Sequence, residues 1–261
     1  MLDRTWLLLI VNLLLPSSVM YAQPTGKTKE LLTKAILAHG GAEALEKLST
    51  ASWKGRGLLY REGKEDKPLP FYGEWSAELP GNYRYTYAFK GIGGGRLPVT
   101  TGLLVDKAWR TMRPDRGADD LTEQQMKIEK DEAHAWHVSH LTPLLTKDYQ
   151  LMALPQTQRD GRNILGLKVD RKGFRGIYLF FDKQTNLLIY MDRKVFDPEK
   201  KQEVLMETSY VNFKQLGGAT LAQSIAMRQG KKLVMELEID TVTLVASFPD
   251  KFFEKPPDPK D

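Results

Sequence analysis

Alternation of apolar and polar residues dominates the second half of the chain, from Asn163 to Ala246. A period of two predicts β-strands, because successive side chains of a strand point to opposite faces. Turn-forming residues separate the alternating segments. The predicted strands are 163–171, 175–181, 187–196, 202–213, 219–228 and 232–246. Short connections force neighbouring strands to pair antiparallel, so we expect a meander that must curl, close or be covered to hide its apolar face.

The last of these strands alternates strictly and shows which face is buried. Its apolar side chains are Leu233, Met235, Leu237 and Ile239, and its acidic side chains are Glu236, Glu238 and Asp240. Such a strand has one wet face and one buried face. In a strongly curved sheet we expect the buried face to be the concave one.

The first half of the chain begins with helical periodicity. Residues 27–38 predict an amphipathic helix and residues 42–48 a shorter one. Strands are predicted at 51–60, 70–78, 82–89 and 99–112. The third of them carries an aromatic row on one face, formed by Tyr83, Tyr85, Tyr87 and Phe89. Such a row either packs in the core or lines a ligand cavity.

Residues 119–146 predict a further helix, which contains three of the four histidines: His134, His137 and His140. These positions spread over an arc of about 120° on a helix, so a single ion can meet two of them but is poorly reached by all three. Glu129, Asp131 and Glu132 lie nearby. Because the His-Glu-x-x-His spacing is absent, metal binding is the weaker interpretation and a helix with boundary histidines the stronger one.

The first residues indicate export. Arg4 precedes an apolar run ending before Pro16, with a candidate cleavage site after Ala22, so we predict a signal peptide at 1–22 and an exported or periplasmic mature protein. The chain has no cysteine, which excludes structural disulfides and thiolate chemistry. We predict one domain over 23–253, followed by a disordered Pro-rich tail at 254–261.

The net charge of +5 is dispersed along the chain. A positive net charge allows transient contact with an anionic membrane surface. The sequence contains no basic stripe of the kind that binds nucleic acid, so we expect no nucleic-acid partner. Serine-nucleophile and paired-carboxylate templates are missing as well. We therefore expect a monomer that is not an enzyme and needs no cofactor.

Three segments resemble the outer-membrane lipoprotein-sorting and lipoprotein-carrier (LolA/LolB-like) superfamily. They are the passage from Ala38-His39-Gly40-Gly41 to Trp53-Lys54-Gly55-Arg56-Gly57, the strand–turn–strand 177–188, and the ending from Ile239 to Phe253. The resemblance implies mainly antiparallel β-structure with helices (α+β), in an unclosed, strongly curved half-barrel covered by helices. It also implies an apolar cavity that receives lipoprotein acyl chains.

The first functional hypothesis is therefore a carrier or binding protein for a lipid, a lipoprotein acyl chain or another apolar ligand. Its expected cavity-lining residues are Tyr83, Tyr85, Tyr87, Phe89, Leu233, Met235, Leu237 and Ile239. Two alternatives stay open. One is a structural or adaptor domain of the cell envelope without a ligand, and the other is a metal-dependent hydrolase that uses His134, His137 and His140.

Overall fold

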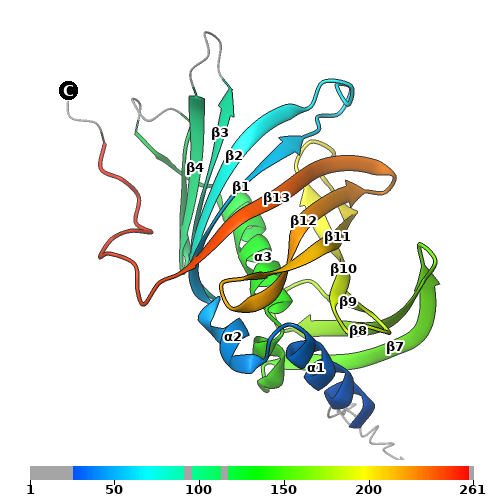
Figure 1. Cartoon of the computed structure of the whole chain (residues 1–261). Helices are drawn as coiled ribbons and strands as arrows, with labels where there is room; N and C mark the ends of the chain where they lie inside the picture. The colour runs from blue at the N-terminus through cyan, green and yellow to red at the C-terminus, as the bar shows by residue number, and fades with distance from the viewer. Residues whose placement is uncertain (1–25, 91–95, 113–116, 259–261) are drawn as a thin grey trace, which may run out of the picture.

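A single antiparallel sheet forms most of the protein (Figure 1). The computed structural model describes residues 26–90, 96–112 and 117–258, so the predicted signal peptide lies outside the described residues. In these ranges the helices are α1 (Gly26–Ala38), α2 (Ala42–Lys47), α3 (Glu123–Ser139) and a 3₁₀ turn, Thr142–Leu145. The strands are β1 (Thr50–Leu59), β2 (Leu69–Glu78), β3 (Asn82–Lys90), β4 (Arg96–Leu104), β5 (Lys107–Thr111), β6 (Asp119–Asp120), β7 (Tyr149–Arg159), β8 (Arg162–Arg171), β9 (Ile177–Asp182), β10 (Leu188–Asp197), β11 (Gln202–Leu216), β12 (Ala219–Gln229) and β13 (Lys232–Leu244).

The order of the strands explains where the long helix must lie. Over the described residues the order is β6-β5-β4-β3-β2-β1-β13-β12-β11-β10-β9-β8-β7. The chain therefore leaves the sheet at one edge, β6, and re-enters at the opposite edge, β7. Helix α3 makes this connection and crosses the concave side of the curved sheet, while α1 and α2 lie together at one end (Figure 1).

The meander of the second half is confirmed. The six predicted strands correspond to β8–β13, and each pairs antiparallel with its neighbours. Unclosed antiparallel structure with helices over one face is also confirmed. The predicted helices at 27–38 and 42–48 correspond to α1 and α2, within one residue at each end. These elements have strong period and short turns, so local sequence and tertiary packing agree.

The strand predicted at 99–112 is wrong, because the chain folds back inside it. Strands β4 and β5 form a hairpin in which Leu104 faces Lys107. Its turn residue Val105 has φ 53°, a conformation that β-branched residues rarely adopt. A two-residue hairpin turn usually contains Asn or Gly, and neither is present here.

The helix predicted at 119–146 is too long. Residues 119–120 form β6, and α3 begins after Thr122, whose hydroxyl accepts from the backbone N–H of Gln125 while the Gln125 side chain accepts from the Thr122 backbone N–H. It ends at Ser139, and Leu141 then has φ 64°. Residues 142–145 form the separate 3₁₀ turn with Pro143 at its start.

Strand β7 was not predicted at all. It contains Pro155, and most of its side chains are exposed. Its ladder with β8 shifts register between Leu154 and Thr157. Proline and weak alternation are tolerated because β7 is the terminal strand of the sheet and pairs on one side only.

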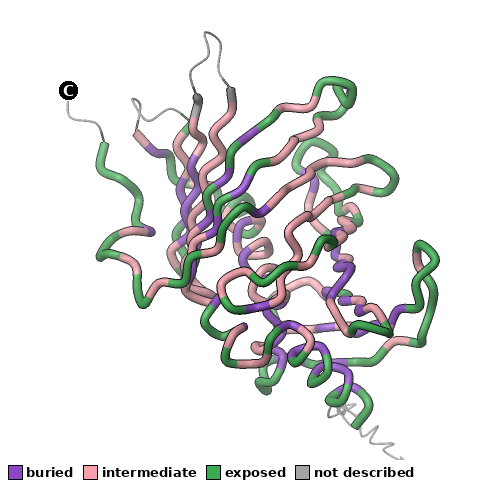
Figure 2. Tube along the Cα trace, in the orientation of Figure 1, coloured by how far each residue is buried: buried purple, intermediate pink, exposed green. Residues whose placement is uncertain are grey.

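Buried residues occur along the strands of the sheet and in α3 (Figure 2), and their apolar side chains form one core cluster between these elements. On the helix side they include Ala133, Ala135 and Val138, all of which are almost completely buried. His39, which follows α1, connects strands β10 and β12 to this core. Its Nδ1 lies 2.7 Å from the backbone oxygen of Thr220, and its Nε2 accepts the backbone N–H of Leu188 at 3.0 Å.

Candidate ligand-binding cavity

A cavity of about 230 Å³ lies between α3 and the concave face of the sheet. Its walls come from α3 and from the strands β1–β3 and β10–β13. The cavity exists because α3 is a single helix, which covers only part of the wide, curved sheet. The lining is mostly apolar, with a few polar groups, as is typical of small-molecule sites.

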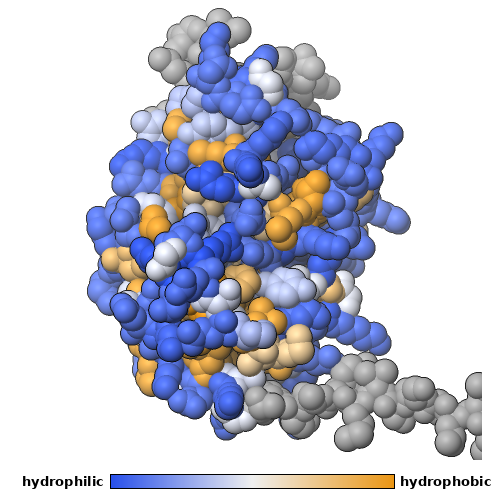
Figure 3. Space-filling view, turned by 90° about the vertical axis from the view of Figure 1, so that its right-hand side faces the viewer, coloured by the Kyte–Doolittle hydropathy of each residue, from blue (hydrophilic) through white to orange (hydrophobic). Residues whose placement is uncertain are grey.

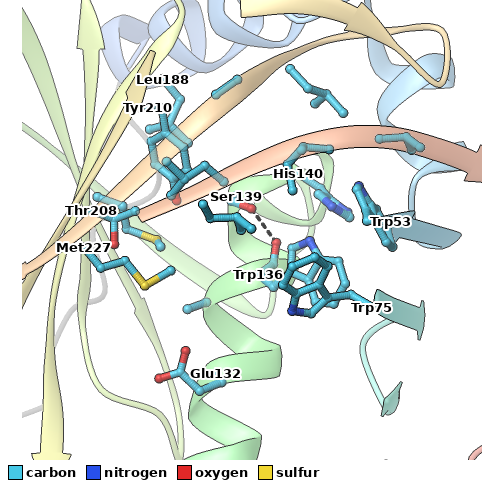
Figure 4. A pocket seen from close by; sticks show the side chains of 18 of the residues that line it. Trp53, Trp75, Glu132, Trp136, Ser139, His140, Leu188, Thr208, Tyr210 and Met227 are labelled. Atoms are coloured by element: carbon cyan, nitrogen blue, oxygen red, sulfur yellow. Dashed lines mark hydrogen bonds between the residues drawn. The ribbon is translucent and has the colours of Figure 1, made fainter. Parts of the chain in front are cut away.

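Aromatic rings form one wall of the cavity (Figure 4). Trp136 of α3 packs edge-on against Trp53 of β1, with ring centroids 4.5 Å apart, and against Tyr83 of β3 at 5.5 Å. Trp75 of β2 lies over Gly73, where an added Cβ would be only 2.0 Å from its ring. Large rings held by neighbouring rings make a stiff wall.

Aliphatic and methionine side chains form the rest of the apolar lining. They are Leu188, Met191, Leu216, Leu221, Ile225, Met227, Met235, Leu237, Ile239 and Val242. Figure 4 shows Met227 on the side away from Trp53 and Trp75. Methionine has three rotatable bonds and a polarizable sulfur, so this part of the lining can adapt to the shape of an apolar guest.

An ion pair lies among these apolar groups. Arg193 of β10 is 4 % exposed, and its Nη2 donates to Glu132 Oε2 of α3 at 2.5 Å. Burial by itself lowers the pKa of Arg193, but the Glu132 carboxylate and its hydrogen bond outweigh this effect and the pKa is raised. The guanidinium is therefore charged at every relevant pH.

The rings of His140 and Tyr210 also face the cavity. Burial, followed by the field of the neighbouring His137, lowers the pKa of His140 to about 3, so this imidazole is neutral near pH 7. Its Nδ1 has no partner among the described residues. Burial raises the pKa of the Tyr210 phenol well above its usual range, so the hydroxyl stays protonated.

No protein-family model matches the sequence, and no curated protein matches it. Solved structures do match. A LolA superfamily protein from Nitrosomonas europaea superposes with a TM-score of 0.54 at 14% identity, covering 82% of this chain and 96% of that one. A putative outer membrane lipoprotein-sorting protein domain from Vibrio parahaemolyticus gives 0.55 at 11% identity, covering 87% and 96%. A DUF1329 family protein from Desulfovibrio piger gives 0.54 at 10% identity, covering 89% and 98%.

The chain has the fold of the LolA superfamily.

Five of the eight side chains predicted to line a cavity in this LolA-like fold do so: Tyr83, Tyr87, Met235, Leu237 and Ile239. The aromatic row of β3 does share one face, since consecutive ring centroids are 5.2, 5.0 and 6.3 Å apart. Tyr85 nevertheless lies under α3, where its hydroxyl donates to Glu129 at 3.3 Å. Phe89 lies farther along β3 and packs against Phe71 and Tyr87.

Leu233 is absent from the cavity lining because the alternation of β13 is interrupted. Met235 faces Met227, but Leu233 faces Arg228, so Val234 is an extra residue in the ladder. Such a bulge changes which face the preceding residues point to. The expectation that Leu233 shares a face with Met235 is therefore wrong, and the sequence contains no glycine or proline at this point to signal the bulge.

The outer two of the three helix histidines, His134 and His140, have different surroundings in the LolA-like fold. His134 stacks on Phe174 with centroids 4.0 Å apart, whereas His140 faces the cavity beside Trp53. The nearby carboxylates are engaged as well, because Glu129, Asp131 and Glu132 bond Arg110, Arg175 and Arg193 respectively. Within the described ranges, no group of three histidine, aspartate or glutamate side chains is arranged to hold a metal ion.

The sequence reasoning missed most of the aromatic wall and the ion pair. Trp53 and Trp75 alternate with exposed residues along β1 and β2, a signal that points them to the buried face. Arg193 lies two residues after Met191 in β10, so it is a charge at an inward position. A charged residue in such a register is a sign of a buried partner.

Proposed function

We propose that this protein is an exported carrier or binding protein that holds an acyl chain or another apolar ligand between its sheet and α3. The observation that carries the proposal is the cavity itself, with a stiff aromatic wall and a methionine-containing apolar lining. Each methylene group buried there contributes about 0.8 kcal/mol, so a chain of several carbons needs no covalent bond or cofactor to be retained.

The fold supports this function. The solved structures that share it include a LolA superfamily protein and a putative outer membrane lipoprotein-sorting domain. The leader-like residues 1–22 support an exported, periplasmic location. In the described residues no helix is long and apolar enough to span a membrane.

The face shown in Figure 3 is consistent with a ligand held inside rather than on this face. The face in Figure 3 is mainly hydrophilic, and its apolar side chains form small separate groups. An adaptor domain without a ligand would be expected to have a filled interior, which the cavity between α3 and the sheet does not match. Because arginines neutralise the carboxylates near the histidines, the hydrolase hypothesis gains no support.

The experiment is to fill the cavity. Ser139 lies on the cavity side of α3, and its hydroxyl donates to the Trp136 backbone oxygen at 2.7 Å (Figure 4). Ser139→Phe would place a ring in the space that a guest needs. Ser209→Phe is the matched control, because Ser209 alternates with the cavity-lining Thr208 and Tyr210 and points to the outer face of β11.

Uptake of the neutral fluorescent probe N-phenyl-1-naphthylamine by the mature protein is the measurement. We expect uptake by the wild type and by Ser209→Phe, and loss of most of it in Ser139→Phe. No uptake by the wild type, together with no co-purifying lipid in native mass spectrometry, would overturn the proposal. Unchanged uptake by a folded Ser139→Phe variant would place the site elsewhere.

A further inference from the structure

The ion pair between the buried Arg193 and Glu132 gives the cavity one polar end. Arg193 extends from β10 and Glu132 from α3, so the pair joins the two elements between which the cavity lies. Glu132 is the more accessible partner, with 37 % of its side chain exposed against 5 % for Arg193. Figure 4 shows Glu132 apart from the aromatic group around Trp53 and Trp75.

The guanidinium of Arg193 has donors to spare. A guanidinium offers five N–H groups, and the bond to Glu132 is made by Nη2. Nε is buried and has no partner within the described residues. Leaving a buried donor unpaired is unfavourable, so a guest that supplies an acceptor gains more here than at an exposed arginine.

The charge of Arg193, in contrast, is already matched. Its partner Glu132 is within hydrogen-bond distance, and Asp131, one residue earlier, is paired with Arg175. A second anion at the guanidinium would lie a few ångströms from the Glu132 carboxylate. Like charges at such a short separation repel each other, and the repulsion is stronger at the low effective dielectric constant of this site than in water.

The Arg193 guanidinium therefore has unpaired N–H donors, but its charge is already compensated by Glu132. This combination favours a neutral hydrogen-bond acceptor. Tyr210 and Thr208 of β11 line the same cavity and add hydroxyl groups, which bond uncharged polar atoms readily (Figure 4). The carbonyl oxygen of an ester or amide is such an acceptor. A free carboxylate would instead have to compete with Glu132 for the guanidinium.

We propose that the Arg193–Glu132 pair is the specificity-determining end of the cavity and selects acyl chains carried as neutral esters or amides over free fatty acids. The inference rests on the proposed function, since it assumes that the cavity takes an acyl chain. Glu132 is the decisive residue of this selectivity, because its carboxylate compensates the Arg193 charge that would otherwise attract the carboxylate of a fatty acid.

The test compares methyl laurate with laurate as competitors of N-phenyl-1-naphthylamine, at about pH 8, where the free acid is ionised. Wild-type protein should bind the ester more tightly. In Glu132→Gln the Arg193 charge is no longer compensated. Laurate should then gain affinity relative to methyl laurate by about tenfold or more, because its carboxylate can form a charge-assisted hydrogen bond with the guanidinium.

Glu238→Gln is the matched control, because it removes the same charge from the outer face of β13, where Glu238 pairs with Arg56. It should leave the ratio as in the wild type. An unchanged ratio in Glu132→Gln, or a preference for laurate in the wild type, would overturn the inference. If neither ligand nor the probe binds the wild type, the proposed function itself fails.

A second variant keeps the inference testable if Glu132→Gln does not fold. Replacing both partners, as in Glu132→Leu/Arg193→Met, leaves no unpaired buried charge, and such replacements are often neutral for stability. The double variant should bind methyl laurate about threefold to tenfold more weakly because the carbonyl loses its donor. Wild-type affinity for the ester in this variant would also overturn the inference.

Discussion

Arg110 of β5 donates a hydrogen bond of 2.8 Å from Nη2 to Oε1 of Glu129 on α3. Glu129 is almost fully buried, and Tyr85 donates to the same oxygen. One turn later Glu132 bonds Arg193 of β10, on the other side of the curved sheet. The helix that roofs the cavity is thus attached to both arms of the half-barrel by charge-assisted bonds, which are stronger than neutral ones.

The Glu129 carboxyl group should make the free energy of unfolding fall as pH rises. Burial raises its pKa to about 7 from 4.5, in spite of the opposing Arg110 charge. The folded state then binds more protons than the unfolded state between these values, so the stabilising contribution is complete below about pH 4.5 and lost as pH rises through about 7. Relative to the wild type, Glu129→Gln should gain stability over this window, on the order of 2 kcal/mol.

Urea unfolding at several pH values between about 5 and 8 measures this difference. Glu123→Gln, at the exposed first turn of α3, is the control and should follow the wild-type pH dependence. Parallel curves for the wild type and Glu129→Gln would contradict the prediction.

The three histidines of α3 should have the opposite effect and make the free energy of unfolding fall as pH decreases. Burial lowers the pKa of His134 and His137 to about 4 and that of His140 to about 3. For a base with a depressed folded-state pKa, the stabilising contribution is complete above the unfolded value of about 6.5 and lost as pH falls toward the folded value. The imidazole resonances of these residues, followed by NMR, should therefore show no titration between about pH 5 and 8. A midpoint near 6.5 for His140 would show that its ring reaches bulk water.

Gly55 should not tolerate a side chain. A Cβ at this position would lie 2.3 Å from the backbone oxygen of Glu238 on β13, at the register shift after Lys54. Gly55→Ala must push β1 and β13 apart, and overpacking of this kind costs about 1–3 kcal/mol. In Gly81→Ala the new Cβ would make only an ordinary contact of 3.7 Å with Val105. Thermal unfolding of both variants checks the difference, and equal melting temperatures would contradict it.

The predicted end of the domain at residue 253 can be tested by truncation. The carbonyl oxygen of Phe253 accepts the indole N–H of Trp109 at 3.0 Å, and its buried ring packs against Phe248 and Phe252. Beyond it, Lys255 makes an ion pair with the exposed Asp120. Removal of 255–261 should cost about 0.5 kcal/mol or less, whereas Phe253→Ala should cost about 3 kcal/mol or more.

Chemical denaturation of the two forms gives these values directly. Should the truncated chain lose as much stability as Phe253→Ala, the Pro-rich tail would be part of the folded domain.

Local pattern was sufficient for most of the sheet. In β8–β13, apolar alternation, turn residues and short connections all favour the same antiparallel meander, and the structure follows them. The aromatic row of β3 was likewise readable, because its period of two is a property of any strand. An amphipathic sheet of this length must cover one face, so a curved sheet with covering helices also followed from the sequence.

Tertiary structure alone decided what that covered face became. The turn at Val105, the bulge at Val234 and the terminal strand β7 have no reliable local signal, because their conformations are imposed by neighbouring strands. The cavity depends on the distance between α3 and the sheet, and the pairing of Arg193 with Glu132 depends on residues 61 positions apart. Such contacts follow from the packing of the whole chain, whereas a periodic pattern reports only which way each side chain points.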